Sequence, residues 1–205
     1  MDISYTYQDQ MNTGDVLLFH TNSWWDYISW VIDLFSWSKY SHAAMIIKNP
    51  PWDENLKGLY VIQSTVGEIH DIQDNEIKIG VQLERFQDVM KYNGTVYWRK
   101  LNINRDKDFN NAVIAAESIA HNRPYDFLPV DWIKTCFDLH SPISNEQRKK
   151  TFFCSALVSF MLVSMGVLPK DTAWSTIRPK DLGTEKGSRL SIQELHTELA
   201  IEELP

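Results

Sequence analysis

The sequence predicts an α+β fold, and two observations support this. Short apolar runs bounded by turn residues recur through the first half of the chain, as β-strands do, while apolar residues at helical spacing dominate the second half. A chain of 205 residues with 43% apolar content is long enough for one substantial core. We therefore expect one domain over residues 1–205, with its core at about 11–183 and a charged surface extension at 184–205.

The predicted strands are short and rich in apolar, β-branched or aromatic residues. The first follows a turn at Thr13–Asp15, and the second is the most apolar of them and ends before Pro50. The expected strands are 16–19, 41–47, 59–64, 68–72 and 94–101.

Helical spacing of apolar residues predicts helices over 106–121 and 152–165, with Thr151 as a possible cap of the second, and a short helix over 83–90. A further helix is expected over 23–37, which contains four tryptophans. These indoles fit core packing, with an acyl pocket or peripheral contact with a bilayer surface as alternatives.

Composition excludes several classes of function. The net charge is −7 and the densest cationic run is Arg148–Lys150, so the basic surface of a nucleic-acid-binding protein is not expected. Residues 1–11 lack the charge and apolar stretch of a signal peptide, and no run approaches the roughly 18 apolar residues of a spanning helix. We expect a soluble, cytoplasmic protein with no spanning segment.

The two cysteines, Cys136 and Cys154, indicate reduced thiols in a reducing compartment rather than a disulfide scaffold. The six histidines and two cysteines show none of the close spacings typical of zinc sites. We expect no metal site and no cofactor.

Cys154 is a candidate nucleophile because it falls in the first turn of a predicted helix. Unpaired backbone N–H groups and the helix dipole lower a thiol pKa there and so favour the reactive thiolate. The alternative is a small apolar side chain on the inner face of the helix. That alternative suits Cys136 better, since it lies mid-segment, and we assign Cys136 a structural role.

His42 is the candidate base, because it opens the most apolar predicted strand, where a polar ring needs a hydrogen-bond partner or a chemical role. The other five histidines lie at element ends or in polar loops. A hydrogen-bonded core histidine is the alternative. A nearby imidazole can take the proton of a thiol and later pass it to a leaving group.

Several short motifs, taken together and in order, resemble the circularly permuted branch of the NlpC/P60 papain-like superfamily over residues 11–183. The motifs are Gly14–Phe19 (GDVLLF), Tyr40–Ile47 (YSHAAMII), Val61–Ser64 (VIQS), Arg123–Asp126 (RPYD), Phe153–Val158 (FCSALV) and Arg178–Leu182 (RPKDL). The resemblance implies a permuted papain-like fold, in which a small antiparallel sheet packs against helices and the cysteine at a helix N-terminus faces the sheet.

The resemblance also implies a catalytic set of Cys154, His42 and Gln63. The family often has a glutamate at the third position, so Gln63 is a departure: an amide orients imidazole but adds no charge, and Ser64 or Glu68 could share the role. The oxyanion would be stabilised by the backbone N–H of Cys154 and a second donor at 20–22. The motif residues Tyr125 and Asp126 fit a structural corner or a substrate contact.

Together these features predict a cysteine-dependent hydrolase or acyltransferase that forms an acyl-enzyme on Cys154. Relatives in this branch act in amide or peptide hydrolysis and in lipid acyl transfer, as in the lecithin retinol acyltransferase group. The expected partner is therefore a peptide, amide or lipid acyl substrate. The alternative is an inactive papain-like module that binds an acyl chain or a protein partner.

Overall fold

The computed structural model describes residues 3–21, 38–66, 69–125 and 152–201, which form an α+β fold around one antiparallel sheet. The six strands lie in the order β4-β3-β2-β1-β5-β6, and each neighbouring pair is antiparallel. Their bounds are β1 Val16–Thr21, β2 His42–Lys48, β3 Leu59–Val66, β4 Ile79–Arg85, β5 Gly94–Arg99 and β6 Leu199–Ile201. The predicted fold class, a small antiparallel sheet packed against helices, is confirmed.

The described α-helices are α1 Ile3–Gln10, α3 Phe86–Val89, α4 Lys107–Ala120 and α6 Cys154–Ser164. Both helices predicted in the second half of the chain are therefore confirmed. The helix expected over 23–37, with its tryptophans, and Thr151 lie outside the described residues. Within the described ranges, no helix combines the length and the apolar character that crossing a bilayer requires.

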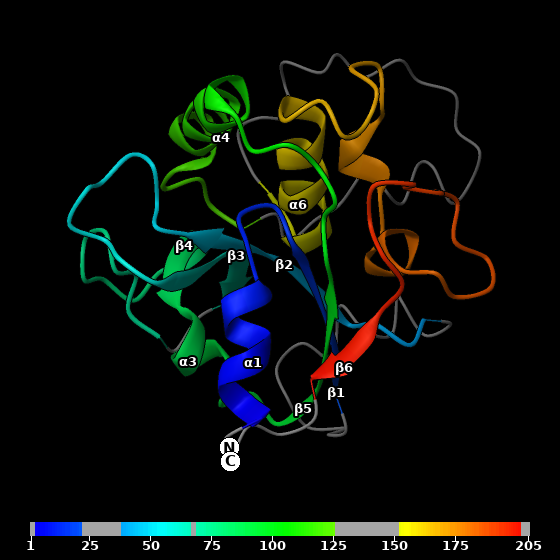
Figure 1. Cartoon of the computed structure of the whole chain (residues 1–205), viewed down its shortest axis with the longest axis horizontal. Coiled ribbons are helices and arrows are strands. Elements are labelled where there is room, and N and C mark those ends of the chain that lie inside the picture. The colour runs from blue at the N-terminus through cyan, green and yellow to red at the C-terminus, as the bar shows by residue number, and fades with distance from the viewer. Residues whose placement is uncertain (1–2, 22–37, 67–68, 126–151, 202–205) are drawn as a thin grey trace.

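The two faces of the sheet carry separate cores, because successive side chains of a strand point to opposite sides. On one face, Met45 and Ile62 belong to the larger core, which α4 and α6 cover. On the other face, Ile46 and Val61 pack with Phe86 of α3 in a smaller core. Figure 1 shows α4 and α6 on one side of the sheet and α1 and α3 on the other.

Two predictions for the region around β4, the strand over 68–72 and the helix over 83–90, are wrong. Residues 69–72 form no strand, and the helix expected over 83–90 is limited to Phe86–Val89. The reason is strand pairing: β4 pairs with β3 from Val66↔Ile79 to Tyr60↔Arg85, which takes Leu83 and Glu84 into the sheet. The strand can form because Gly80 has a φ of +145° and no side chain, and a Cβ there would collide with the backbone of Arg123.

Asp15 does more than make a turn. Its buried carboxylate accepts hydrogen bonds from the Trp98 indole (2.8 Å), the backbone N–H of Leu101 (3.0 Å) and the Arg105 guanidinium (3.1 Å). Burial raises the pKa of Asp15, and these donors oppose that effect. The carboxylate thus fixes β1 against the chain that follows β5.

The expectation of a surface extension beyond residue 183 is wrong for much of the segment. Ile192 and Leu195 are buried in the larger core, and β6 adds an edge strand to the sheet beside β5. Arg99 of β5 donates to the carbonyls of Leu182, Leu195 and His196. The C-terminal residues are therefore integral to the fold, a result that charge content alone does not predict.

The last motif, at 178–182, forms a short 3-10 helix, Pro179–Leu182, organised by the buried carboxylate of Asp181. The carboxylate of Asp181 accepts from the Arg178 guanidinium (2.9 Å), the Arg189 guanidinium (2.8 Å) and the backbone N–H groups of both arginines. These donors hold the pKa of Asp181 well below its ordinary value, despite burial.

Candidate functional site

His42 is the first residue of β2, and its imidazole is 9% exposed. Strand alternation puts it on the same face as Ala44 and Ile46, the face of the smaller core. Its ring packs against Phe19 of the neighbouring β1, with 5.1 Å between the ring centroids. The backbone and this aromatic contact therefore fix the position of the imidazole.

Gln63 of β3 is the hydrogen-bond partner of His42. The distance between His42 Nε2 and Gln63 Oε1 is 2.7 Å. Since an amide oxygen only accepts, His42 donates from Nε2, which leaves Nδ1 without a proton in the neutral ring. The contact predicted between these two residues is present.

The two side chains meet where β2 and β3 no longer pair. Backbone pairing runs from Lys48↔Leu59 to Met45↔Ile62, and His42 and Gln63 lie beyond its end. The alternative partners are not used: the Ser64 hydroxyl donates to the carbonyl of Phe152, and Glu68 lies outside the described residues.

Cys154 begins α6, as predicted, and its side chain is 4% exposed. Two serines anchor this helix end: Ser64 bonds the carbonyl of Phe152, and the Ser155 hydroxyl donates to the carbonyl of Ile177 at 2.7 Å. The helix packs against β2 and β3. The backbone N–H of Ala43, next to His42 in the chain, lies close enough to the thiol to lower its pKa.

Burial controls the charge of both groups. It raises the pKa of the Cys154 thiol, and the backbone N–H groups of Ala43, Ser155 and Cys154 offset only part of that effect. It lowers the pKa of His42 from 6.5 to about 4. The pKa depression expected from the helix N-terminus is thus outweighed, and at neutral pH the groups are a neutral thiol and a neutral imidazole.

No hydrogen bond joins the Cys154 sulfur to the His42 ring within the described part of the chain. The imidazole's polar contact is with Gln63, and the thiol's contacts are with backbone N–H groups and the Ser155 side chain. The thiol therefore lies near the residue that follows His42 in the chain, but its helix covers the opposite face of the sheet from the one on which His42 packs, and no ion pair joins the two groups.

Glu84 of β4 is a site residue that the sequence prediction missed. It is fully buried, accepts a hydrogen bond from Gln82 Nε2, and has its second oxygen, Oε2, unpartnered among the described residues. Burial raises its pKa from 4.5 to about 7, and the neighbouring Gln63 amide acts in the opposite direction. The available signal was the alternation of polar and apolar residues at 81–84, which typifies a strand.

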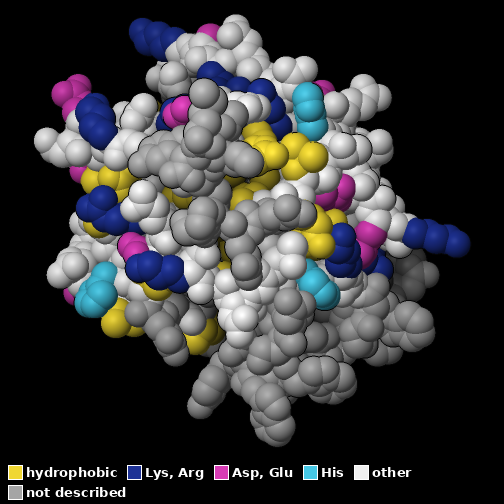
Figure 2. Space-filling view, turned by 60° about the horizontal axis from the view of Figure 1, so that its bottom comes forward, with side chains coloured by type: hydrophobic (Ala, Val, Ile, Leu, Met, Phe, Trp, Pro, Cys, Tyr) yellow, Lys and Arg dark blue, Asp and Glu magenta, His cyan; other side chains and the backbone are white. Residues whose placement is uncertain are grey.

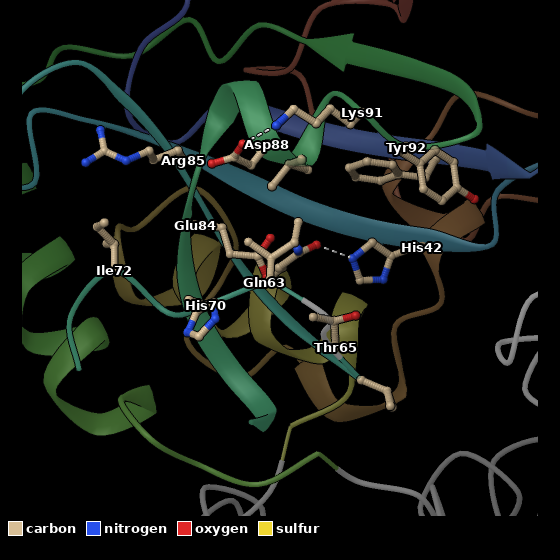
Figure 3. A pocket seen from close by; sticks show the side chains of 14 residues that line it. His42, Gln63, Thr65, His70, Ile72, Glu84, Arg85, Asp88, Lys91 and Tyr92 are labelled. Atoms are coloured by element: carbon tan, nitrogen blue, oxygen red, sulfur yellow. Dashed lines mark hydrogen bonds and ion pairs between the residues drawn. The ribbon is translucent and has the colours of Figure 1, made fainter. Parts of the chain in front are cut away.

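His42, Gln63 and Glu84 line one pocket of about 630 Å³, a size typical of small-ligand sites. Figure 3 shows the three side chains in a row, with Tyr92 beside His42, and with Arg85, Asp88 and Lys91 along the α3 side. Asp88 and Lys91 form an ion pair of 2.7 Å. The remaining walls are mainly apolar: Phe19, Val66, Ile69, Ile72 and Val89.

The other sequence candidates are not assembled with this group. His20 Nδ1 donates to the carbonyl of Lys39 at 2.6 Å, and Asn22 lies outside the described residues, so the second oxyanion donor stays a prediction. Tyr125 forms a backbone bridge with Phe152, in keeping with a structural corner. Asp126 and Cys136 lie outside the described residues.

The side chains in the described ranges form no group of three or more His, Cys, Asp or Glu that could hold a metal ion. The charged surface is mixed as well. Figure 2 shows Lys and Arg side chains interspersed with Asp and Glu on the face it displays, and no large patch of one sign.

Comparisons with known proteins show similarity at the level of fold. No protein-family model matches the sequence, and no curated protein matches it. Among solved structures, the chain is similar to a crystal structure described as metalloprotein yiiX from Escherichia coli O157:H7, DUF1105. The TM-score is 0.50 at 15% identity, over 96% of this chain and 99% of that one. At this identity the likeness bears on the fold alone.

Proposed function

We propose that the protein is a cysteine-dependent hydrolase or acyltransferase, with Cys154 as nucleophile, His42 as base and Gln63 as the residue that orients His42. The observation that carries the proposal is the 2.7 Å bond between His42 Nε2 and Gln63 Oε1, together with the position of the Cys154 thiol close to the backbone of Ala43, the residue that follows His42. The resemblance to the permuted NlpC/P60 branch adds support, since it assigns the same three residues.

In the proposed reaction, His42 Nδ1 takes the proton of the Cys154 thiol as the sulfur attacks the carbonyl carbon of an amide, ester or thioester. The backbone N–H of Cys154 stabilises the oxyanion, and the imidazolium then protonates the leaving group as its bond breaks. Water or another acceptor, deprotonated by His42, releases the acyl group and restores the thiol. Because both groups start neutral, proton transfer accompanies attack rather than preceding it.

The pocket that His42 lines supports a mainly apolar acyl or leaving group, because most of its walls are apolar, although Cys154 is not among the residues that line it. This suits a lipid acyl chain and an apolar peptide side chain equally, so peptide, amide and lipid acyl substrates all belong to the proposal. A reducing compartment keeps a catalytic thiol free, and for this chain we propose that compartment to be the cytoplasm. The solved neighbour is named a metalloprotein; the described residues of this chain contain no group of three or more His, Cys, Asp or Glu that could hold a metal ion.

The test is acylation by 4-nitrophenyl acetate, followed by intact mass and peptide mapping. We expect a single acetyl group on Cys154, formed with a burst of 4-nitrophenol, and no such adduct in Cys154→Ala. His42→Ala should acylate about 10²- to 10⁴-fold more slowly, the usual contribution of a general base. Cys136→Ala is the matched control and should behave like the wild type.

A second candidate function is that of a non-catalytic module with the same fold, which binds an acyl chain or a protein partner. The burial of Cys154 and its raised thiol pKa favour it. On that reading, the acetyl group fails to appear on Cys154, or the acylation rates of the wild type and His42→Ala are equal. Either result would reject the enzyme proposal.

A further inference from the structure

The Gln63 amide has two different ends, and the end that faces His42 decides the tautomer of the imidazole. If Oε1 faces the ring, Nε2 must carry the proton and Nδ1 is free to accept one. If the amide is turned over, its NH₂ group donates to Nε2, and the ring proton moves to Nδ1. Only the first arrangement leaves the proposed base nitrogen able to take a thiol proton.

Glu84 lies on the other side of this amide. Gln63 is paired with Gln82 across β3 and β4, and Glu84 is two residues further along β4, so it shares the face of the sheet with both. Its Oε1 accepts from Gln82 Nε2, and its buried Oε2 has no hydrogen-bond partner among the described residues. Figure 3 shows Glu84 and His42 on opposite sides of Gln63.

A carboxylate accepts hydrogen bonds and cannot donate them. A buried carboxylate next to Gln63 therefore requires the NH₂ end of the amide on its own side, which leaves Oε1 for His42. The stabilising effect of Gln63 on the ionised form of Glu84 agrees with this direction of donation. An amide can present either its oxygen or its NH₂ group to His42, so the choice of Oε1 comes from Glu84 on the other side.

We propose that Glu84 is a positioning residue: acting through the Gln63 amide, its carboxylate holds His42 in the tautomer that carries the proton on Nε2 and leaves Nδ1 as the base. The inference rests on the proposed function only in taking Nδ1 as the catalytic nitrogen. On this inference, Glu84 contributes a carboxylate to a site whose third predicted residue, Gln63, is an amide. The negative charge of Glu84 acts on His42 only through the Gln63 amide.

The charged groups around Glu84 make its effect dependent on pH. Asp71 and Asp88 add to the burial that raises its pKa, whereas the amides of Gln63 and Gln82 oppose it. Each carboxylate neighbour has its own cation: Lys78 for Asp71 at 2.5 Å and Lys91 for Asp88 at 2.7 Å. A protonated Glu84 can donate as well as accept, so the constraint on Gln63 holds only above the pKa of Glu84.

The test is the tautomer of His42, read from long-range proton–nitrogen NMR spectra of the full chain labelled with ¹⁵N-histidine at about pH 8. His42→Gln identifies the His42 signals by their loss. In the wild type we expect Nδ1 to resonate as an unprotonated nitrogen and Nε2 as a protonated one. The opposite assignment would overturn the inference without any variant being needed.

Three variants complete the experiment. Glu84→Gln should lose the single tautomer and show protonation of Nδ1, while Asp88→Asn, which removes another carboxylate of the same pocket, should leave the wild-type pattern. Exchanging the two groups, with Gln63→Glu and Glu84→Gln in one chain, should restore protonated Nε2, because the carboxylate introduced on β3 then accepts from the ring directly. An unchanged tautomer in Glu84→Gln would reject the role of Glu84.

The outcome is separate from that of the acylation experiment, since the tautomer is measured without substrate. If Cys154 is not acylated but the tautomer responds as expected, the proposed function fails and the positioning stands. If Cys154 is acylated and Glu84→Gln keeps the wild-type tautomer, the positioning fails alone.

Discussion

At the scale of the residue, burial rather than sequence position sets the chemistry of the site. The pKa of His42 lies near 4, and the pKa of the Cys154 thiol is raised, so neither group is charged at neutral pH. A protein that stored a thiolate–imidazolium pair would face a large desolvation cost at this buried position. The proposed reaction avoids that cost by creating the ion pair only during attack.

The raised pKa of Glu84 predicts how the stability of the folded chain depends on pH. Its pKa is raised from 4.5 to about 7 in the folded chain, so the folded state holds the proton more tightly than the unfolded state does. Stability of the wild type should therefore fall as pH rises from about 4.5 to 7, relative to Glu84→Gln, by at most on the order of 3 kcal/mol.

Urea unfolding of both proteins at a series of pH values measures this difference. Comparing the two chains cancels the opposite contribution of His42, whose lowered pKa makes stability rise over about pH 4 to 6.5. A difference between the two proteins that stays constant with pH would show that Glu84 has the same pKa in the folded and the unfolded chain.

The sequence identified His42 and Gln63, which meet in the structure, because one stands at a strand start and the other in the next strand. It also placed Cys154 at a helix start, but that helix packs on the opposite face of the sheet from His42. It missed Glu84, whose neighbours Leu83, Phe86 and Val89 also satisfy helical spacing. It also misjudged the thiol pKa, since the helix N-terminus is a local feature and burial is a tertiary one.

At the scale of the element, α6 is held by its N-terminal end. Nearly every side chain from Cys154 to Leu162 is buried, so the helix has no solvated face to define its rotation. Position is instead defined by hydrogen bonds from Ser64 to the carbonyl of Phe152 and from Ser155 to the carbonyl of Ile177. These bonds fix the location of the thiol.

Ser155→Ala tests this anchor. It leaves the buried carbonyl of Ile177 without its donor, which typically costs about 1–3 kcal/mol. Ser164→Ala is the matched control in the same helix, because Ser164 bonds only the carbonyl of Phe160 one turn earlier and is partly exposed. Thermal unfolding should show the larger loss in Ser155→Ala; equal losses would contradict the anchoring role.

Element prediction succeeded where one periodicity was unambiguous. The strands that became β1, β2, β3 and β5 were recognisable from apolar runs, and α4 from its amphipathic spacing. Strand β4 was obscured because Gln82 and Glu84 are polar residues that point into a buried site. Strand β6 is only three residues long and takes its pairing from β5, which no local pattern reveals.

At the scale of the whole molecule, hydrogen bonds and ion pairs join the C-terminal segment to the sheet. Arg99 ties β5 to three carbonyls between residues 182 and 196, and the Asp181 cluster joins Arg178 to Arg189.

Asp181→Asn should destabilise the protein by about 1–3 kcal/mol, the usual cost of losing hydrogen bonds to a buried charged group, since the remaining Arg178 and Arg189 guanidiniums reach solvent. The wild-type carboxylate has a lowered pKa, so its contribution is present at neutral pH and is lost as pH falls below about 4. Chemical unfolding at about pH 7 and pH 3 should show a large difference that shrinks in acid. Asp171→Asn, at an exposed position, is the control and should have little effect.

The cover that α6 gives to the sheet has a consequence for how the protein is made. The strands from β1 to β4 end at residue 85, but the helix that shields Met45, Ile62 and Leu83 is complete only at residue 164. At typical synthesis rates, an apolar sheet face stays uncovered on the ribosome for roughly 5 to 15 seconds. A nascent chain of this protein therefore passes through an aggregation-prone stage before Cys154 has been added.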